Sequence, residues 1–361
     1  MKTAILIDTP LQLLNAMNLV CTLRQKGELD AFIVPQFRNA EQIIGRVKET
    51  GIFNRVYTLK LQRLGKDRYF WAIFGLFAPR LYARKWLKLP RLDYDLFYLS
   101  DPTKMFEYII DSNAKSANRI AYDDGIGSYT GDIFRGRRNK IYMALRKLMG
   151  KDYFIKEMYL NQPDYYEGTV KLKLHKIQDI QQNGLGETVR MVFDVKKSTL
   201  YSDYKYVYLN QPTTASKDLA HDLEVDEKIL SVVGEEVGDN LLVRMHPRSK
   251  MEDYYGRFRI DDVNNMWEVI CEEEIDGNSV LISSYSTTQF APKFMHGGEP
   301  YLVFTVNLYK DLSNSVVGEN DMLKRIKKAY SDESKIYVVH SYDELRVALR
   351  EIKGALAKAE K

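Results

Sequence analysis

The stretch AILIDTPLQLLNAMNLVCTLRQKG, residues 4–27, decides the fold class, because it predicts a short apolar strand followed at once by a helix. The same alternation continues through the first half of the chain. Further strands are predicted at residues 30–35, 55–61, 95–100 and 119–125, and helices at residues 40–51 and 103–113. Short apolar strands that alternate with helices are typical of a parallel, doubly wound sheet.

A second series of strands and helices begins after residue 203. It comprises strands at 206–212, 241–247, 279–284, 300–306 and 335–340, and helices at 226–238, 263–273 and 342–360. The segment 153–203, between the two series, shows no pattern that we can assign. Two such series predict the α/β architecture called GT-B, in which two Rossmann-like doubly wound domains face a central cleft that holds the active site.

The predicted boundaries follow from this alternation. The N-terminal domain covers residues 1–200 and the C-terminal domain covers residues 204–340. A last helix lies within residues 341–361, and we expect it to pack back on the N-terminal domain. One face of this helix carries four apolar residues, namely Leu345, Leu349, Ile352 and Leu356.

The composition limits the class of protein. A net charge of +4 over 361 residues, with both signs interspersed, does not predict a nucleic-acid-binding protein. Cys21 and Cys271 lie in no CxxC pair, which argues against a cysteine zinc site and favours a reducing compartment. The longest apolar run, residues 69–77, is far shorter than the roughly 20 residues of a membrane span. The N-terminus does not resemble a signal peptide, so we expect a cytoplasmic protein.

A polar turn, Thr9-Pro10-Leu11-Gln12, follows the first predicted strand. One interpretation is a helix start, in which Thr9 is the N-cap, Pro10 the first helical residue and Gln12 the reciprocal side chain of a capping box. A second interpretation adds a binding function, because the turn lies at the carboxyl end of the strand and faces the predicted cleft.

An acidic pair follows the strand at residues 119–122, in the sequence Tyr122-Asp123-Asp124-Gly125. Adjacent residues of an extended chain point to opposite sides, so only one acid would face the cleft, where it could act as a general base. A surface turn is the alternative, because Asp and Gly are common turn residues. A Mg²⁺ site is less favoured, since no second acidic cluster lies at a matching strand end.

Positive charge gathers at another strand end, in Arg244-Met245-His246-Pro247-Arg248. A protonated His246 flanked by arginines could neutralise or protonate a leaving phosphate. The hydroxyl-rich run Ser283–Thr288 follows the next strand. It predicts either an anion site or a simple helix N-cap. Glu268 lies in a helical pattern, where an exposed helix acid is the default and a contact with ribose hydroxyls is the alternative.

Taken in order, these elements resemble the bacterial sialyltransferases of glycosyltransferase family 52 and, more distantly, family 80 and the bacterial polysialyltransferases. The resemblance covers short motifs between residues 9 and 284. They are the TPLQ turn at Thr9–Gln12, the acidic pair before Gly125, the stretch Asn210-Gln211-Pro212, His246-Pro247, Glu268, and the pair Ser283-Ser284.

The resemblance implies inverting transfer of sialic acid from CMP-sialic acid to a hydroxyl of a glycan of the capsule or lipooligosaccharide type, without a metal or other cofactor. The N-terminal domain would bind the acceptor and the C-terminal domain the nucleotide sugar. The implied roles are Asp124 as general base, His246 on the CMP phosphate, Glu268 on the ribose, and Ser283 and Ser284 on the phosphate. Family 52 also contains enzymes that transfer glucose, so a UDP-hexose or another activated sugar remains an alternative donor.

Two basic stretches suggest peripheral contact with an anionic membrane at its inner face, which would bring the enzyme to a lipid-linked acceptor. The first contains Arg80, Arg84, Lys85, Trp86, Lys88 and Arg91, and the second contains Arg135, Arg137, Arg138, Lys140, Arg146, Lys147 and Lys151. The alternative is a solvated helix face. A further alternative for the whole chain is a non-catalytic protein that binds a nucleotide sugar or a glycan.

Overall fold

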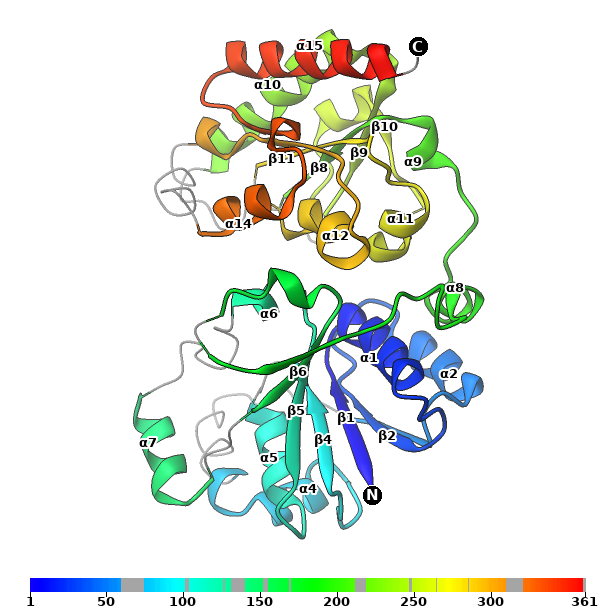
Figure 1. The fold of residues 1–361 in the computed structure, drawn as a ribbon, viewed down its shortest axis with the longest axis vertical. Helices are drawn as coiled ribbons and strands as arrows, with labels where there is room; N and C mark the ends of the chain where they lie inside the picture. The colour runs from blue at the N-terminus through cyan, green and yellow to red at the C-terminus, as the bar shows by residue number, and fades with distance from the viewer. Residues whose placement is uncertain are drawn as a thin grey trace. The chain divides into compact units, whose positions relative to one another are not determined.

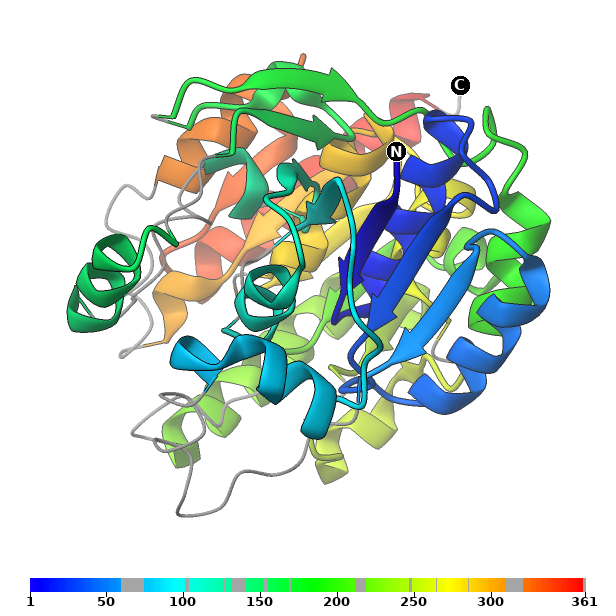
Figure 2. The same cartoon turned by 90° about the horizontal axis from the view of Figure 1, so that it is seen from below.

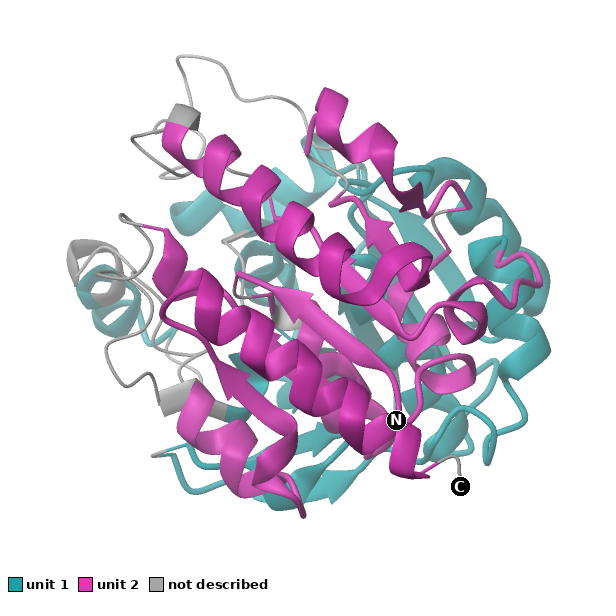
Figure 3. Ribbon diagram, turned by 90° about the horizontal axis from the view of Figure 1, so that it is seen from above, with its two compact units in different colours: residues 1–194 teal, residues 195–361 magenta. Residues whose placement is uncertain are grey.

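The computed structural model describes residues 1–59, 75–100, 104–125, 127–130, 140–151, 155–168, 170–211, 219–246, 249–263, 265–284, 286–309 and 321–359. The chain forms two compact units, unit 1 (Met1–Asp194) and unit 2 (Val195–Lys361), which Figure 3 draws in teal and magenta. Unit 1 therefore ends a few residues before the limit predicted at residue 200. The residues just after that boundary belong to unit 2.

Within the described residues, unit 1 is built on one parallel sheet with the strand order β3-β2-β1-β4-β5-β6-β7 (Figures 1 and 2). The strands are β1 (Thr3–Ile7), β2 (Leu29–Ile33), β3 (Arg55–Thr58), β4 (Leu96–Leu99), β5 (Asn118–Tyr122), β6 (Glu157–Leu160) and β7 (Lys173–Lys176). The helices are α1 (Pro10–Thr22), α2 (Ala40–Thr50), α4 (Pro79–Lys85), α5 (Lys104–Ser112), α6 (Gly127–Thr130), α7 (Lys140–Leu148) and α8 (Gly186–Phe193), with the 3-10 turn η2 (Pro163–Tyr165).

Unit 2 repeats the design with a parallel sheet in the order β10-β9-β8-β11-β12-β13, again counted over the described part of the chain. Its strands are β8 (Tyr206–Leu209), β9 (Leu241–Arg244), β10 (Arg259–Ile260), β11 (Val280–Ser283), β12 (Tyr301–Phe304) and β13 (Ile336–Val338). Its helices are α9 (Leu200–Asp203), α10 (Leu219–Val237), α11 (Trp267–Glu273), α12 (Thr287–His296), α14 (Asp321–Ala329) and α15 (Tyr342–Ala359), with the 3-10 turns η4 (Gly238–Asn240), η5 (Asp253–Arg257), η6 (Val306–Leu308) and η7 (Glu333–Lys335).

The central strands are buried on both faces, as expected for parallel sheets that are covered by helices on each side. All five residues of β1 and all four of β4, β8 and β11 are buried. In each unit the strand order reverses beside the first strand, between β1 and β4 and between β8 and β11. The predicted doubly wound α/β class, with two Rossmann-like units as in the GT-B fold, is confirmed.

The terminal helix α15 belongs to the core of unit 2. Leu345, Leu349 and Ile352 are almost fully buried, in the same apolar cluster as Ile229 and Val233 of α10. Figure 1 shows α15 in red lying against α10. This placement differs from the expectation that the helix packs back on the N-terminal domain. The apolar face read from the sequence is right, but its partner is the neighbouring helix of its own unit.

The segment that the sequence left unassigned completes unit 1. β7 lies at the edge of the sheet, where its residues are exposed or half-buried, so it lacks the continuous apolar run of an inner strand. Val189 and Val192 are the buried residues of α8, and Arg46 of α2 donates a hydrogen bond to the carbonyl of Val192. These contacts attach the end of unit 1 to its first helices.

Candidate functional site

The turn after β1 is a capped helix start. Thr9 has extended backbone angles, and its Oγ1 accepts a hydrogen bond from the backbone N–H of Gln12 at 3.1 Å. Pro10 is the first residue of α1. The Gln12 side chain accepts from the backbone N–H of Asp8 at 2.7 Å, one residue earlier than in the expected capping box. The capping interpretation is therefore confirmed with this shift, and a binding role for the turn stays a prediction.

Asp123 is a buried acid that is held by neutral hydrogen-bond donors. Its side chain is 1% exposed and accepts from the Gly125 N–H at 2.8 Å, from the Tyr129 hydroxyl at 2.6 Å, and from both the backbone and side-chain N–H groups of Asn161 at 3.0 Å. Burial raises the pKa of the Asp123 carboxyl, and these hydrogen bonds oppose the rise. Asn15 of α1 donates to the Asp123 carbonyl at 3.0 Å. Asp123 thus fastens the turn after β5 to α1 and to the end of β6.

Asp124 lies on the other side of the chain and is half-buried. Its backbone N–H donates to Ser128 Oγ at 2.8 Å. The next residue, Gly125, has φ of 87°, a conformation that favours glycine, and a Cβ there would lie 3.2 Å from Leu11. The two adjacent acids therefore differ in burial, with Asp123 buried and Asp124 half-buried, and a role of Asp124 as general base stays a prediction.

Asp8, which follows β1, and Asp124, which follows β5, both act on the hydroxyl of Tyr122. The hydroxyl of Tyr122 is fully buried and donates to the Leu6 carbonyl at 2.6 Å. Burial raises the pKa of Tyr122, and the charges of Asp124 and Asp8 raise it further. The charges of both carboxylates therefore act on the Tyr122 hydroxyl. The sequence analysis overlooked Asp8, although it directly follows the first strand.

In unit 2, candidate residues meet at the point where the strand order reverses. Gln211, at the end of β8, donates through Nε2 to Ser286 Oγ at 2.9 Å, and Ser286 caps α12 by accepting from the Thr288 N–H. This hydrogen bond crosses between the ends of β8 and β11, the location at which ligands bind in open α/β sheets. Ser283 is fully buried and donates to Gln289 at 2.5 Å, so the structure assigns it a contact inside the unit. Ser284 is 6% exposed in the same turn.

His246 follows β9 beside this turn. Its backbone N–H donates to Asn210 Oδ1 at 3.4 Å, and its carbonyl accepts from the Ser249 N–H at 2.9 Å. The side chain is half-exposed. Pro247 and Arg248 lie outside the described residues. The structure therefore brings His246 and Gln211 together through Asn210.

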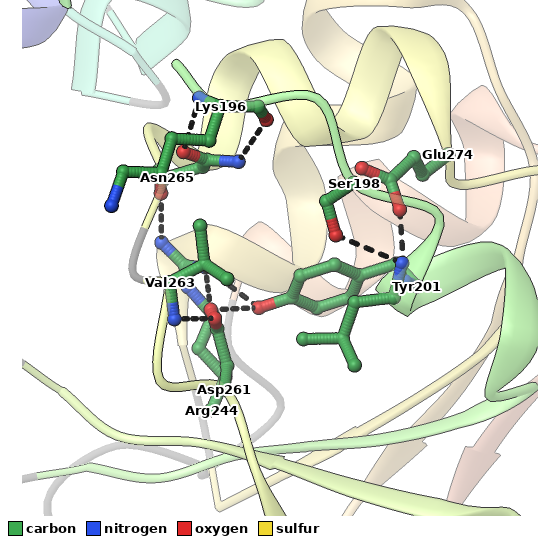
Figure 4. Close-up of polar contacts among 9 residues, drawn as sticks. Lys196, Ser198, Tyr201, Arg244, Asp261, Val263, Asn265 and Glu274 are labelled. Carbon is green, nitrogen blue, oxygen red and sulfur yellow. Dashed lines mark hydrogen bonds and ion pairs between the residues drawn. The ribbon is translucent and has the colours of Figure 1, made fainter. Parts of the chain in front are cut away.

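Arg244 has protein partners for its guanidinium, as Figure 4 shows. Nη1 donates to Asp261 at 2.6 Å and to the Tyr201 hydroxyl at 2.7 Å, and Nη2 donates to the Asn265 carbonyl at 2.7 Å. The guanidinium also lies 5.1 Å from the ring centre of Trp267. A direct contact of Arg244 with phosphate stays a prediction. The contacts that are present fix the end of β9 to the start of α11.

Glu268 lies in the first turn of α11, where a negative charge is favourable. It is half-buried, in contrast to the exposed helix acid that is the default for its pattern. Burial raises the pKa of the Glu268 carboxyl, while its own backbone N–H and the charge of Arg244 oppose the rise. Its carbonyl is within 3.0 Å of His296 Nε2. Glu268 thus lies near Arg244, at the carboxyl edge of the sheet.

The basic stretches are only partly on the surface. Arg80, Arg84 and Lys85 are exposed, together with the apolar side chains of Phe77 and Leu81. Arg146 is 1% exposed, and its guanidinium is paired with two acids of α5, with 2.8 Å to Asp111 and 3.6 Å to Glu107. Arg146 is therefore wrongly included in a membrane-facing stretch. Arg135, Arg137 and Arg138 lie outside the described residues.

The described part of the chain contains no group of three or more His, Cys, Asp or Glu side chains arranged to hold a metal ion. Among the same residues, no helix is both long and apolar enough to cross a membrane.

Solved structures with a similar fold include a UDP-GlcNAc 2-epimerase and glycosyltransferases. The chain is similar to UDP-GlcNAc 2-epimerase from Methanocaldococcus jannaschii, with a TM-score of 0.58 and 11% identity over 97% of this chain and 92% of that chain. It is also similar to spinosyn forosaminyltransferase SpnP (TM-score 0.52, 12% identity, 97% and 90% covered) and to the glycosyltransferase VinC in complex with DTDP (TM-score 0.51, 11% identity, 99% and 94% covered). At these identities the likeness establishes the fold alone. The sequence matches no model of a protein family and no curated protein.

Proposed function

We propose that this chain is an inverting, metal-independent sialyltransferase that moves sialic acid from CMP-sialic acid to a hydroxyl of a glycan acceptor. The observation that carries the proposal is the separation of Asp123 and Asp124. Asp123 is buried and its carboxylate accepts hydrogen bonds from the protein. Asp124 is half-buried and follows β5, at the strand end where the proposal requires a general base. The order of the motifs, which resembles that of glycosyltransferase family 52, supports the choice of donor.

In the proposed reaction, Asp124 removes the proton from the attacking acceptor hydroxyl. The new bond forms from that oxygen to the anomeric carbon of sialic acid, while the bond from this carbon to the CMP phosphate breaks. A general base positioned in this way contributes roughly 10²- to 10⁴-fold in rate. The charges of Asp8 and Asp124 both act on the buried hydroxyl of Tyr122, which raises the pKa of that tyrosine.

The proposed nucleotide site is the reversal point of unit 2. His246 and the turn at Ser284 would stabilise the charge on the departing phosphate, and Glu268 would accept hydrogen bonds from ribose hydroxyls. Gln211 holds the Ser286 cap and so fixes the N-terminus of α12. Backbone N–H groups at a helix N-terminus favour a phosphate. Arg244 supports this site by holding the end of β9, because its hydrogen bonds go to Asp261 and to the carbonyl of Asn265.

A thermal-shift screen tests this function directly. The purified chain is mixed with CMP, CDP, UDP, GDP or ADP, with and without EDTA, and the melting temperature is recorded. A selective rise with CMP that EDTA leaves unchanged is the expected result, since a ligand that binds only the folded state raises its stability. Loss of the effect with EDTA would contradict metal independence, and no shift with any nucleotide would contradict the nucleotide site.

A second candidate is a GT-B transferase that uses a UDP-hexose or another activated sugar. The fold is shared with VinC, which was solved with DTDP, and with UDP-GlcNAc 2-epimerases, so the observed architecture accommodates other nucleotides. A selective shift with UDP in the same screen would favour this candidate. A non-catalytic binding protein would show a shift but no turnover, and replacing Asp124 would then change nothing.

The acceptor is proposed to be a lipid-linked glycan reached from the cytoplasmic face of an anionic membrane. The exposed Arg80, Arg84 and Lys85, beside the exposed Phe77 and Leu81, offer the charge and apolar contact of a peripheral membrane surface. Co-sedimentation with vesicles of phosphatidylserine and phosphatidylcholine at low salt is the test. Equal binding to vesicles without the anionic lipid, or none to either, would contradict this contact.

A further inference from the structure

A buried carboxylate in unit 2 lies at the centre of a ring of tyrosines. Asp226 of α10 is 3% exposed. It accepts hydrogen bonds from four hydroxyls, those of Tyr208, Tyr254, Tyr255 and Tyr309. Among the residues that the structure describes, no lysine, arginine or histidine forms an ion pair with it. Since a buried charge is costly unless it is well hydrogen-bonded, this carboxylate depends on the tyrosines.

One of these tyrosines connects the carboxylate to the proposed nucleotide site. The Tyr255 hydroxyl accepts from Asn210 Nδ2 at 2.6 Å, and Asn210 Oδ1 accepts from the His246 backbone N–H at 3.4 Å. The Asn210 carbonyl accepts from Gln211 Nε2 at 3.0 Å. A continuous chain of contacts therefore runs from Asp226 to His246, which we place beside the phosphate, and to Gln211, which holds the Ser286 cap.

The charge of Asp226 determines which group donates and which accepts in each of these hydrogen bonds. Burial raises the pKa of Asp226 to about 6, while hydrogen bonds from Tyr255, Tyr254 and Tyr309 oppose the rise. At neutral pH the group is therefore a carboxylate, which only accepts hydrogen bonds. Tyr255 must donate to it, so its oxygen is left to accept from Asn210. The amide of Asn210 is then oriented with its nitrogen toward Tyr255 and its oxygen toward His246.

We infer that Asp226 is a positioning residue for the nucleotide site, and that it acts through Tyr255 and Asn210 to fix the backbone at His246 and Gln211. Asp226 itself does not reach the ligand. The inference rests on the proposed function, because it assumes that a nucleotide binds where these strands end. It goes further by assigning a role to a helix residue that no motif in the sequence singled out.

Two adjacent tyrosines provide a matched test. Tyr255→Phe removes the hydroxyl that bonds both Asp226 and Asn210, whereas Tyr254→Phe removes a hydroxyl that bonds Asp226 at 3.1 Å and does not bond Asn210. Tyr255→Phe is expected to weaken CMP binding about tenfold, which corresponds to one hydrogen bond of ordinary worth, and Tyr254→Phe by less than about twofold. Titration calorimetry measures both affinities, and thermal melting shows whether each variant is folded.

Equal weakening in the two variants, or an unchanged affinity in Tyr255→Phe, would overturn the inference. Asn210→Ala provides a second route if Tyr255→Phe does not fold, because it breaks the same chain and leaves the tyrosine ring intact. The double variant should bind CMP about as well as either single variant, since both changes interrupt one connection. If the wild-type chain binds no nucleotide at all, that result contradicts the proposed function and therefore also the inference that rests on it.

Discussion

The carboxyl edges of the two sheets each bury an ion, but they stabilise it differently. In unit 1 the described partners of the Asp123 carboxylate are neutral donors, namely Gly125, Tyr129 and Asn161. In unit 2 the guanidinium of Arg244 is paired with Asp261 at 2.6 Å. The first arrangement stabilises its charge by hydrogen bonds from neutral groups, while the second balances its charge with an opposite one. Under the proposed function, each edge has one group that builds the turn and another that acts on the substrate.

The largest expected effect tests this division of labour within unit 1. Asp124→Asn should reduce the rate of transfer by roughly 10²- to 10⁴-fold, because the amide cannot take the proton of the acceptor hydroxyl. The melting temperature and the affinity for CMP should stay near wild-type values, since the hydrogen bond from Asp124 to Ser128 is donated by the backbone N–H, which the substitution keeps. Donor turnover measured with an acceptor mixture, beside thermal melting, provides both readings.

The neighbouring acid is the control for that variant. Asp123→Asn should lower stability by roughly 1–3 kcal/mol, because an amide nitrogen would face hydrogen-bond donors that lose a buried acceptor. Urea unfolding measures this loss. A comparable loss of stability in Asp124→Asn would show that both acids are structural and would remove the proposed base.

The second prediction concerns the ion pair of unit 2. Arg244→Met should lower the free energy of unfolding by about 3–5 kcal/mol, because it removes the positive charge that is paired with the buried carboxylate of Asp261. The side chains are 13% and 1% exposed, so solvent does little to replace the lost contact. Arg244→Met combined with Asp261→Leu should recover much of the stability. A single variant that is as stable as the wild type would contradict the comparison between the two edges.

The third prediction uses pH, because the buried Asp226, like Asp123, accepts its described hydrogen bonds from neutral donors. Its folded-state pKa of about 6 lies above the ordinary value of 3.8. The Asp226 carboxyl therefore holds its proton more tightly in the folded state than in the unfolded state. The contribution of this proton to the free energy of unfolding is complete below about pH 4 and is lost as the pH rises through about 6. Between about pH 4 and pH 7, the free energy of unfolding of the wild type should fall by about 3 kcal/mol relative to that of Asp226→Asn. Urea unfolding at several pH values measures the difference, and parallel curves would contradict it.

The sequence predicted the parts of the molecule that depend on neighbours along the chain. The strand and helix alternation, the Thr9 cap and the opposite orientation of Asp123 and Asp124 are local patterns with periods of a few residues. Long-range partners were not predictable. Asn161, which directly follows β6, donates a hydrogen bond to Asp123, and Asp261, which directly follows β10, pairs with Arg244. No spacing rule links such pairs, because the sheet order brings them together.

An edge strand and a buried polar cluster were also not predicted, because their surroundings depend on residues far apart in the sequence. β7 lies at the edge of its sheet and shows no apolar run. Asp226 sits in a predicted helix, where its pattern alone indicates a polar face. The four tyrosines that donate to it, from β8, from η5 and from the residue after η6, show that this position is internal. The choice of Glu268 came from the family resemblance, and its proximity to Arg244 was visible only in the structure.

The smallest expected effect refines the unit 1 edge at the turn that carries Asp124. Gly125→Ala should lower stability by about 1–2 kcal/mol, because φ of 87° is unfavourable for a residue with a Cβ. Contact of that Cβ with Leu11, 3.2 Å away, should also shift the turn. Gly127→Ala is the matched control, since its backbone is not left-handed and no atom lies within 4 Å of the added Cβ. If Asp124 is the base, Gly125→Ala should reduce turnover more than it reduces CMP affinity, and Gly127→Ala should change neither. Equal effects of the two substitutions would mean that the precise direction of the Asp124 carboxylate is unimportant for transfer.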